Sequence, residues 1–344
     1  MKAIITICSA FLVASFMFSP STCQAQDPGY KLLREFHLKS PGGWDYINVN
    51  PESKRIYVSH GNAVIVLDER NGDSIGVIDY TPGVHGIVFA PQFNKGFISD
   101  GRSSMVTVFN LKTNEVMDSV PTGEGPDGIL YEDYSKTVIA NDGRAQAMTM
   151  IDAATDKVVK TLPLGGRPET AVSDGAGFVY VNIESKSEVE QIRVSDWAIL
   201  NHWPTGKGES PSGLAIDRKH HRLFIGCRNK LMVVMNAETG AVLAELPIGE
   251  GCDGTDFDPG PGFAFSSNGD GTLTIVKEVD PEHFEVVENA TTKRGARTST
   301  VDTKTHRLFL PTAEFGPTPA PTAERPRQRP PMLPGTFEVL EVGK

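Results

Sequence analysis

The chain has 344 residues, of which 39% are apolar and 22% are charged. This balance excludes a disordered chain and a bundle of membrane helices. It holds 34 Gly and 24 Pro, above the usual shares of ~7% and ~5%, which indicates many tight turns and therefore many short strands. The formal net charge of −10 argues against a nucleic acid as partner, because a phosphate backbone attracts a basic surface.

Residues 1–25 have the pattern of a signal peptide. Lys2 supplies a positive start, residues 4–18 are almost wholly apolar, and Ala25 fits the position before a signal-peptidase cut. The apolar run is shorter than the ~20 residues that a membrane helix needs. We therefore expect export through the Sec pathway, to the periplasm or the extracellular space, and a mature chain without a transmembrane segment.

A phrase of 40–44 residues recurs seven times after this segment, most clearly at residues 56–68 and 237–249. Each copy has short runs of alternating apolar residues, separated by turns such as Asn71-Gly72 and Thr239-Gly240. Third strands are expected at residues 64–67, 106–109, 148–151 and 231–235. Seven copies at this period predict an all-β fold, a seven-bladed β-propeller with four antiparallel strands per blade.

The two ends of the repeat array complement each other. Residues 30–39 match a fourth strand but have no blade before them, and the last repeat ends with a third strand at 337–342. We expect the N-terminal strand to complete the last blade, which leaves no open edge. Residues 26–344 are thus predicted to form a single seven-bladed propeller, with a Pro-rich loop at 311–335 inserted in the last blade.

The repeated phrase also carries a resemblance. Its Tyr-Val-Ser, Thr-Gly-x-Val and Pro-x-Gly elements resemble the YVTN repeat of the secreted YncE-like β-propeller family, over residues 30–344. The resemblance implies a seven-bladed ring and an exported or surface protein. It implies no reaction, because propellers carry many unrelated functions.

The repeat alignment predicts which side chains gather at the central channel. First strands line the channel, and the loops before them share one face with the loops between second and third strands. We call this the mouth face. The residues that open the first strands form the predicted mouth ring: Asp45, His85, Asp127, Glu169, Ser212, Asp253 and Arg297. A second column ends the second strands: His60, Asp100, Asn141, Asn182, Cys227, Ser267 and Thr312.

Several carboxylates in one ring repel one another unless a positive charge offsets them. A divalent cation is one solution, and its candidate ligands are Asp45, His85, Asp127 and Glu169. In the other solution each acid bonds to the amides of its own turn, as Asp commonly does. The sequence leaves both solutions open.

Positive charge on this face has two sources. Arg297 is expected to form an ion pair with Asp253 or Asp45, in preference to holding a ligand carboxylate. The Pro-rich loop at 311–335 is either a lid drawn across the acidic mouth or a solvated tether. Its three arginines are Arg325, Arg327 and Arg329.

Cys227 and Cys252 remain when the signal peptide is removed. They fall in neighbouring repeats, in a compartment that permits disulfides. A disulfide and two free buried thiols are both open, and either is preferred to a soft-metal pair with a nearby His.

The sequence has no His-Glu-x-x-His signature, and its one Gly-x-Ser-x-Gly match, at residues 72–76, falls at the expected Asn71-Gly72 turn between two strands and not at a strand-to-helix elbow. We therefore predict a non-enzymatic binding scaffold, expected to be a monomer, whose mouth face binds a small polar ligand, a cation or a partner protein. The residues expected to bind are Asp45, His85, Asp127, Glu169, Asp253, Arg297, His60 and Asp100. The alternative is a metal-assisted lyase or lactone hydrolase on the same face, with His85 or His60 moving protons. Apart from a divalent cation, no cofactor is implied.

Overall fold

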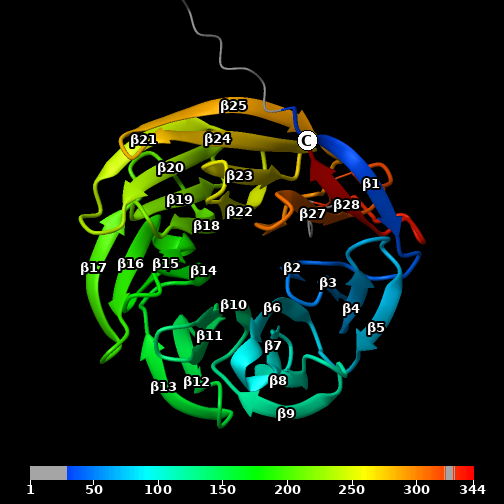
Figure 1. Cartoon of the computed structure of the whole chain (residues 1–344), viewed down its shortest axis with the longest axis horizontal. Coiled ribbons are helices and arrows are strands. Elements are labelled where there is room, and N and C mark those ends of the chain that lie inside the picture. The colour runs from blue at the N-terminus through cyan, green and yellow to red at the C-terminus, as the bar shows by residue number, and fades with distance from the viewer. Residues whose placement is uncertain (1–28, 321, 323–327, 329) are drawn as a thin grey trace, which may run out of the picture.

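The structure is a computed structural model that describes residues 29–320, 322, 328 and 330–344. The predicted signal peptide, with its cleavage site, and the three loop arginines Arg325, Arg327 and Arg329 lie outside these residues. Seven four-stranded antiparallel sheets surround a central axis (Figure 1). The prediction of a seven-bladed β-propeller is confirmed.

Each blade is a meander whose first strand is innermost and whose fourth strand is outermost. Blades 1 and 2 consist of β2 (Ile47–Asn50), β3 (Arg55–His60), β4 (Ala63–Asp68), β5 (Ser74–Ile78), and β6 (Val84–Ala90), β7 (Lys95–Asp100), β8 (Met105–Asn110), β9 (Val116–Pro121). Blades 3 and 4 consist of β10 (Pro126–Glu132), β11 (Thr137–Asp142), β12 (Ala147–Asp152), β13 (Lys157–Pro163), and β14 (Pro168–Ser173), β15 (Phe178–Ile183), β16 (Glu188–Arg193), β17 (Ala198–Pro204). Blades 5 and 6 consist of β18 (Pro211–Asp217), β19 (Arg222–Cys227), β20 (Leu231–Asn236), β21 (Val242–Pro247), and β22 (Cys252–Asp258), β23 (Phe263–Asn268), β24 (Thr272–Asp280), β25 (His283–Thr291). Blade 7 consists of β26 (Thr300–Asp302), β27 (Arg307–Thr312), β28 (Glu338–Gly343) and the N-terminal β1 (Lys31–His37). Two 3-10 turns, η1 (Pro91–Phe93) and η2 (Glu184–Lys186), complete the described elements.

The predicted third strands and turns account for this meander. The four expected third strands lie within β4, β8, β12 and β20, whose inner residues are buried on both sides. The turns into the fourth strands place one residue in the left-handed region. Gly72 (φ 77°), Asn114 (φ 63°) and Asp156 (φ 59°) occupy this position in three blades, and Gly, Asn and Asp adopt this conformation more readily than other residues. Blade 4 has Trp197 (φ 57°) there.

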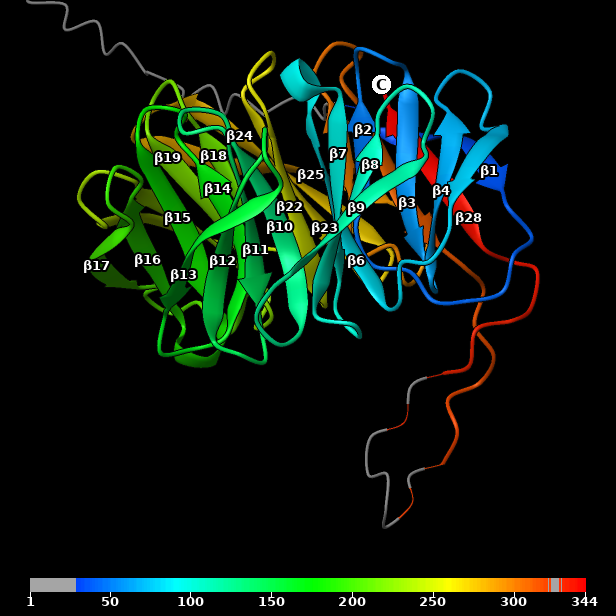
Figure 2. The same ribbon diagram turned by 90° about the horizontal axis from the view of Figure 1, so that it is seen from below.

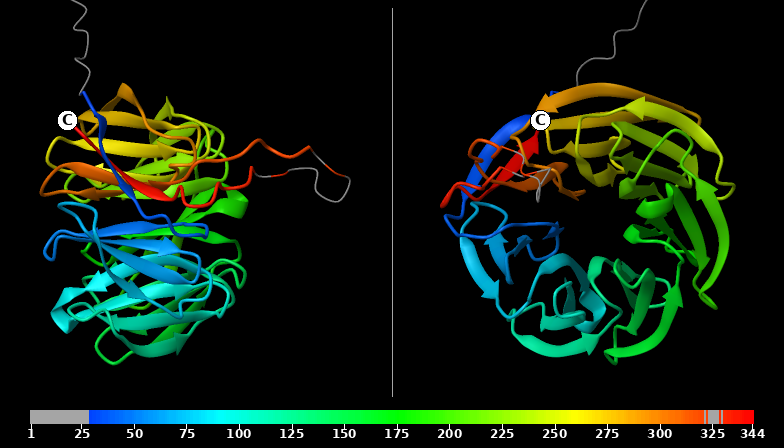
Figure 3. Two further views of the ribbon diagram at one scale, coloured as in Figure 1. Left: turned by 90° about the vertical axis from the view of Figure 1, so that its right-hand side faces the viewer. Right: turned by 180° about the vertical axis from the view of Figure 1, so that it is seen from behind.

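Blade 7 closes the ring with both ends of the described chain. β1 pairs antiparallel with β28, from Lys31 opposite Gly343 to His37 opposite Glu338, and Figure 3 shows this N-terminal strand in blue beside the C-terminal strand in red. Because β1 is the outermost strand of the last blade, no blade ends with its third strand unpaired. The predicted closure is confirmed.

The hydrophobic core is divided among the junctions between blades. Seven clusters of buried side chains each join two neighbouring blades. At the junction of blades 7 and 1, for example, Phe36 and Phe309 of blade 7, with ring centroids 6.5 Å apart, belong to one cluster with Ile56 and Leu67 of blade 1. The fold therefore holds the mouth-face loops in fixed positions around the axis through packing between sheets.

The Pro-rich loop joins β27 to β28. Its base is a short antiparallel pairing in which Phe315 lies opposite Met332, and Leu333 donates a 2.8 Å backbone hydrogen bond to Glu314. Beyond this base the described residues lead away from the ring (Figure 2). They do not cross the channel, so of the two alternatives that the sequence left open, the described part of the loop does not form a lid.

Candidate functional site

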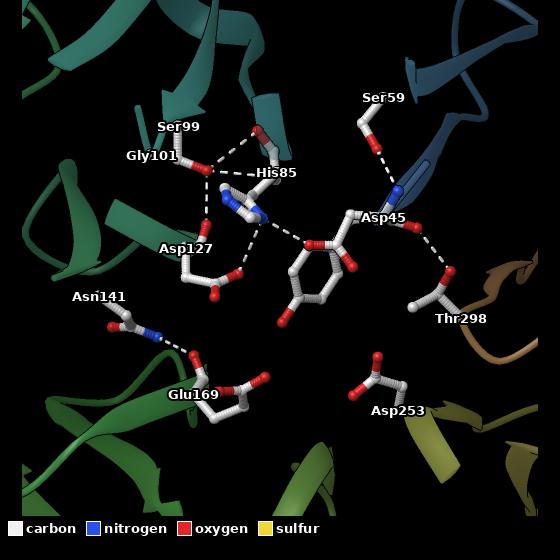
Figure 4. Close-up of polar contacts among 12 residues, drawn as sticks. Asp45, Ser59, His85, Ser99, Gly101, Asp127, Asn141, Glu169, Asp253 and Thr298 are labelled. Atoms are coloured by element: carbon white, nitrogen blue, oxygen red, sulfur yellow. Dashed lines mark hydrogen bonds and ion pairs between the residues drawn. The ribbon is translucent and has the colours of Figure 1, made fainter. Parts of the chain in front are cut away.

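The mouth ring is built by a repeated irregularity in the first strands. Five of its residues lie at a register shift between the first and second strand of their blade: His85, Asp127, Glu169, Ser212 and Asp253. Such bulges re-aim a side chain, and they are common beside functional sites. Figure 4 shows Asp45, His85, Asp127, Glu169 and Asp253, contributed by five different blades, around one space.

The glycines that follow ring residues serve the packing of blades. A Cβ at Gly128, which follows Asp127, would lie 2.4 Å from the carbonyl oxygen of Glu169 in the next blade. A Cβ at Gly86, which follows His85, would lie 2.7 Å from the side chain of Ile129. The glycine that follows the ring residue is therefore required at these two positions, because neighbouring first strands approach each other closely there.

The imidazole of His85 lies between two carboxylates. Its Nδ1 is 2.6 Å from Oδ2 of Asp45 and 3.4 Å from Oδ1 of Asp127. Burial lowers the pKa of His85, but the hydrogen bond to Asp45 and the charges of both aspartates outweigh it, so the pKa is raised above 6.5. A protonated His85 supplies the positive charge that a cation would otherwise bring.

The spacing around His85 favours a proton over a metal ion. Two ligands of one tetrahedral metal with bonds of ~2.0–2.2 Å lie ~3.3 Å apart. The 2.6 Å between His85 and Asp45 is instead a hydrogen-bond distance. As arranged, the cluster can hold and exchange a proton at Nδ1.

Asp253 and Arg297 form the other side of the mouth ring. Arg297 donates from Nε to Asp253 at 2.8 Å and from Nη2 to Asp45 at 3.3 Å, which is the expected ion pairing. Ser212 donates a 2.6 Å hydrogen bond to Asp253, and Arg228 lies 3.5 Å from the same carboxylate. These contacts compensate much of the predicted acidic charge from within the ring.

Glu169 is the exception among the ring acids. Its carboxylate has no hydrogen bond or ion pair among the described residues. Burial, followed by the neighbouring charges of Asp127 and Asp253, raises the pKa of Glu169 well above 4.5. Burial also raises the pKa of Asp127. The ring therefore retains a protonated or uncompensated carboxyl group on the blade 3 and 4 side.

The second predicted column divides into two sets. Four penultimate residues of the second strands reach the next blade, where they hold the main chain of the ring: the predicted Asn141, Asn182 and Ser267, and Ser99, which precedes the predicted Asp100. Ser99 donates to the carbonyl oxygen of Asp127 at 2.5 Å, Asn141 to that of Glu169 at 2.6 Å, and Ser267 to that of Arg297 at 2.8 Å. They position the mouth ring and do not form a second ring.

Two carboxylates at the last position of these strands bond within their own blades. Asp100 is buried and accepts a 2.6 Å hydrogen bond from Thr107, and Asp142 accepts one of the same length from Thr149. Burial raises the pKa of Asp100 to about 7. Asp100 therefore joins strands of blade 2 and lies apart from the predicted set of binding residues.

His60 is likewise turned away from the mouth ring. It is buried and stacks on Phe337 of the last blade with ring centroids 4.1 Å apart, and its Nε2 lies 2.9 Å from Oγ of Ser40. Burial lowers the pKa of His60. Its side chain packs at the junction of blades 7 and 1. The structure thus gathers six of the eight predicted binding residues and leaves out His60 and Asp100.

The two described cysteines are free and buried. Cys227 packs in the cluster between blades 4 and 5, whereas Cys252 packs in the cluster between blades 5 and 6. Burial, with a smaller contribution from the other thiol, raises the pKa of Cys227 to about 12, and burial raises that of Cys252 to about 11. Of the alternatives that the sequence left open, the structure has two free thiols.

A pocket of about 600 Å³ adjoins the mouth ring and shares Asp253 and Arg297 with it. Its wall includes Trp44, whose ring lies 5.9 Å from that of Phe315 at the base of the Pro-rich loop. The guanidinium of Arg297 lies 5.8 Å from the Trp44 ring centroid. The pocket therefore combines aromatic surface with charged groups, as small-molecule sites commonly do.

Three residues of this pocket were not identified from the sequence. Arg228 and Arg294 belong to loops of single blades, and Phe315 belongs to the loop insertion, so none occupies a repeated position. Arg294 is exposed, and its guanidinium has no hydrogen bond or ion pair among the described residues. The only signal for them was their proximity in sequence to predicted ring or column residues, such as Cys227 and Arg297.

Three solved structures share this fold at low sequence identity. The hydrazine synthase of Kuenenia stuttgartiensis aligns with a TM-score of 0.70 at 12% identity, over 80% of this chain and 94% of that chain. U3-55K aligns with a TM-score of 0.73 at 9% identity, and the WD40 repeats of RRP9 with 0.75 at 8% identity, each over 92% of this chain and 99% of the other. No family model and no curated protein sequence matches the chain. At such identities the likeness shows the fold alone, a seven-bladed β-propeller, and propellers carry many unrelated functions.

No helix within the described residues is long and apolar enough to span a bilayer.

Proposed function

We propose that this chain is an exported binding scaffold, related to the YVTN-repeat propellers of the YncE-like family, that binds a small polar ligand on its mouth face. The ligand would lie in the pocket beside the mouth ring, with an anionic group against Arg294 and Arg228. Its flat, apolar part would contact Trp44 and Phe315.

The observation that carries this proposal is Arg294. An exposed guanidinium with no partner among the described residues, on the wall of a pocket with two aromatic rings, is suited to a planar carboxylate or phosphate. Arg228 adds a second positive charge, which Glu184 and Asp253 hold in place at 3.3 and 3.5 Å. Most of the acidic mouth is compensated internally, so it does not repel an anion as strongly as its composition suggests.

Thermal denaturation and calorimetry with benzoate, phenyl phosphate and benzylamine test this proposal. Benzoate and phenyl phosphate should bind and raise the melting temperature, since a ligand that binds only the folded state stabilises it. Benzylamine, which carries the same ring with the opposite charge, should not.

Two arginine variants locate the binding site. Arg294→Ala should lose binding of both anions with an unchanged melting temperature of the free protein. Arg193→Ala, which removes an exposed arginine paired with Asp196 on the outer surface, should bind as the unmodified protein does. Equal binding by the two variants, or stabilisation by benzylamine alone, would contradict the proposed ligand class.

The proposed export needs a separate test. Expression of the full chain in a bacterial host should yield a secreted or periplasmic protein whose first residue is Gln26. Retention of residues 1–25 on the recovered protein would rule out the proposed cleavage.

A further inference from the structure

We propose a binding site for a divalent transition metal, best suited to Zn²⁺, at the rim of blade 4, formed by Glu188, Glu190 and His202. This site is separate from the mouth face and from the pocket described above. Its ligands come from β16 and β17, the third and fourth strands of the blade, which lie at the periphery of the propeller (Figure 1).

Strand pairing brings these three side chains to one face of the sheet. Glu190 of β16 lies directly opposite His202 of β17 in the antiparallel register, and such partners project from the same face. Glu188 precedes Glu190 by two positions, so it points to that face as well. The arrangement uses two neighbouring strands joined by a short turn and needs no loop movement.

The distances match those between ligands of one metal ion. Nδ1 of His202 lies 3.2 Å from Oε1 of Glu190 and 3.5 Å from Oε1 of Glu188. Bonds of ~2.0–2.2 Å in a tetrahedral zinc site place neighbouring ligand atoms ~3.3 Å apart. The three ligand atoms all lie within 4.8 Å of one another. The half-exposed His202 leaves the fourth position open to a water molecule.

Three buried carboxylate oxygens of the cluster have no hydrogen bond. Glu190 is 0% exposed, and neither of its carboxylate oxygens has a hydrogen bond to a described residue. Oε1 of Glu188 is also buried without one. Unsatisfied buried oxygens of this kind are rare and costly.

A second cluster of similar composition shows what a satisfied arrangement looks like. In the junction of blades 5 and 6, Nδ1 of His220 lies 2.6 Å from Asp217 and 2.8 Å from Glu278. The contact with Glu278 is a hydrogen bond and that with Asp217 is an ion pair, and both are shorter than the spacing between two ligands of one metal. His220 thus already bonds to both acids, and a metal ion would have to break these bonds.

A third cluster contains its own cation. Glu35, His37 and Glu338 surround Nζ of Lys293, which lies 2.9 Å from Glu35 and 2.7 Å from Glu338. At the blade 4 cluster the nearest lysine, Lys186, lies 3.5 Å from Glu188 alone. Among these three clusters of described residues, the blade 4 cluster is therefore the one in which both oxygens of a buried carboxylate, that of Glu190, have neither a hydrogen bond nor a lysine.

The ligand set indicates the class of metal. One imidazole and two carboxylates, with an open fourth position, suit Zn²⁺ and its neighbours Co²⁺ and Ni²⁺. Ca²⁺ and Mg²⁺ prefer six or more oxygen ligands and are less well served by an imidazole. We therefore expect Zn²⁺ to bind and Ca²⁺ and Mg²⁺ not to compete.

Calorimetric titration of tag-free protein with ZnCl₂ tests the site. The unmodified protein should bind one equivalent. His202→Ala should weaken zinc binding at least ~100-fold, the upper end of what loss of a supporting residue costs, because it removes a ligand outright. His220→Ala, the matched control from the hydrogen-bonded cluster, should still bind one equivalent with unchanged affinity.

Two further measurements keep the test decisive. Co²⁺ substitution should give the visible absorption of a four-coordinate site in the unmodified protein and in His220→Ala, and lose it in His202→Ala. Because His202 is half-exposed, its truncation should leave the circular dichroism spectrum unchanged. Absence of zinc binding by the unmodified protein, equal binding by His202→Ala, or loss of binding in Asp127→Asn alone would overturn the proposal.

Discussion

Nδ2 of Asn141, on the second strand of blade 3, donates a 2.6 Å hydrogen bond to the main-chain carbonyl of Glu169 on the first strand of blade 4. The equivalent Asn182 of blade 4 bonds in the same way to the carbonyls of Ser212 and Gly213 in blade 5, at 3.2 and 3.0 Å. The side-chain amide of an asparagine in one blade therefore holds the main chain at the mouth-ring residue of the next blade. Stability of the ring and geometry of the mouth are linked through these contacts.

Substitution of Asn141 by Ala should separate the effect on the stability of the ring from the effect on the geometry of the mouth. Loss of the hydrogen bond leaves a carbonyl unsatisfied, so we expect a loss of about 1–3 kcal/mol in the free energy of unfolding. Asn182→Ala should cost a similar amount. Only Asn141→Ala should shift the titration of Glu169, because only it holds that residue. Carboxyl titration followed by NMR, together with urea denaturation, checks both parts; identical titration in the two variants would contradict the positioning role.

Glu169 itself makes stability depend on pH. Because burial and neighbouring carboxylates raise its pKa in the folded protein, the folded state holds this proton more tightly than the unfolded chain does. The stabilising contribution of the Glu169 proton to the free energy of unfolding is fully present below the pKa of 4.5 that the group has in the unfolded chain. This contribution is lost as the pH rises through the raised pKa of the folded protein.

Glu169→Gln removes this dependence. At pH 4 the melting temperature of the variant should equal that of the unmodified protein. At pH 8 it should be higher, by roughly 2–4 °C for each kcal/mol gained in the free energy of unfolding. Glu238→Gln, at an exposed turn, should follow the unmodified protein at both values. A variant that is less stable than the unmodified protein at pH 8 would show that the carboxylate is stabilising, contrary to this expectation.

The sequence predicts the ring and its closure because each blade must satisfy the same demands. A buried third strand, a left-handed turn residue and a polar residue before each first strand recur at a fixed spacing. The N-terminal strand at residues 30–39 was identified because it matches a fourth strand that the last repeat lacks. Such patterns are local in sequence, and their spatial consequence follows from the repeat.

The side-chain orientation in the second column was harder to predict. The column joined Asn141 with Asp100, which differ by one position within their strands. A shift of one residue sends a side chain to the opposite face of a sheet. Asn141 therefore reaches the next blade, while Asp100 bonds to Thr107 of its own blade.

The flanking pocket and the blade 4 cluster depend on contacts that no repeat encodes. Phe315 reaches Trp44 across more than two hundred residues of sequence, from an insertion that occurs in one blade. The pairing of Glu190 with His202 depends on the register of one hairpin, which is set by its turn geometry. Neither relation has a signal in composition or period.

The free thiols give a chemical prediction. Burial raises the pKa of both Cys227 and Cys252, and the thiolate is the reactive species. The folded chain from residue 26 onward should therefore not react with a thiol reagent at pH 8. After denaturation, two thiols per chain should react with the reagent, whether or not the protein has first been reduced. A rise in the count on reduction would indicate a disulfide and contradict the free pair.

Closure of the ring by β1 can be tested at one side chain. Phe36 is buried at 5% exposure and packs at the junction of blades 7 and 1. It also covers the turn of blade 1, where a Cβ on Gly72 would lie 2.3 Å from the Phe36 ring. Truncation of a buried Phe to Ala typically costs about 3–5 kcal/mol, from lost burial and the cavity left behind.

Phe36→Ala should therefore lower the free energy of unfolding by that amount and weaken the seam at which both ends of the described chain meet. Val159→Ala, at a fourth-strand residue that is 55% exposed, is the matched truncation outside the core and should change stability by less than about 0.5 kcal/mol. Hydrogen exchange provides the spatial readout: amides of β28, which pair with β1, should lose protection before those of blade 4. Uniform loss of protection around the ring would show that the propeller unfolds as one unit and that its closing strand is not the weakest point.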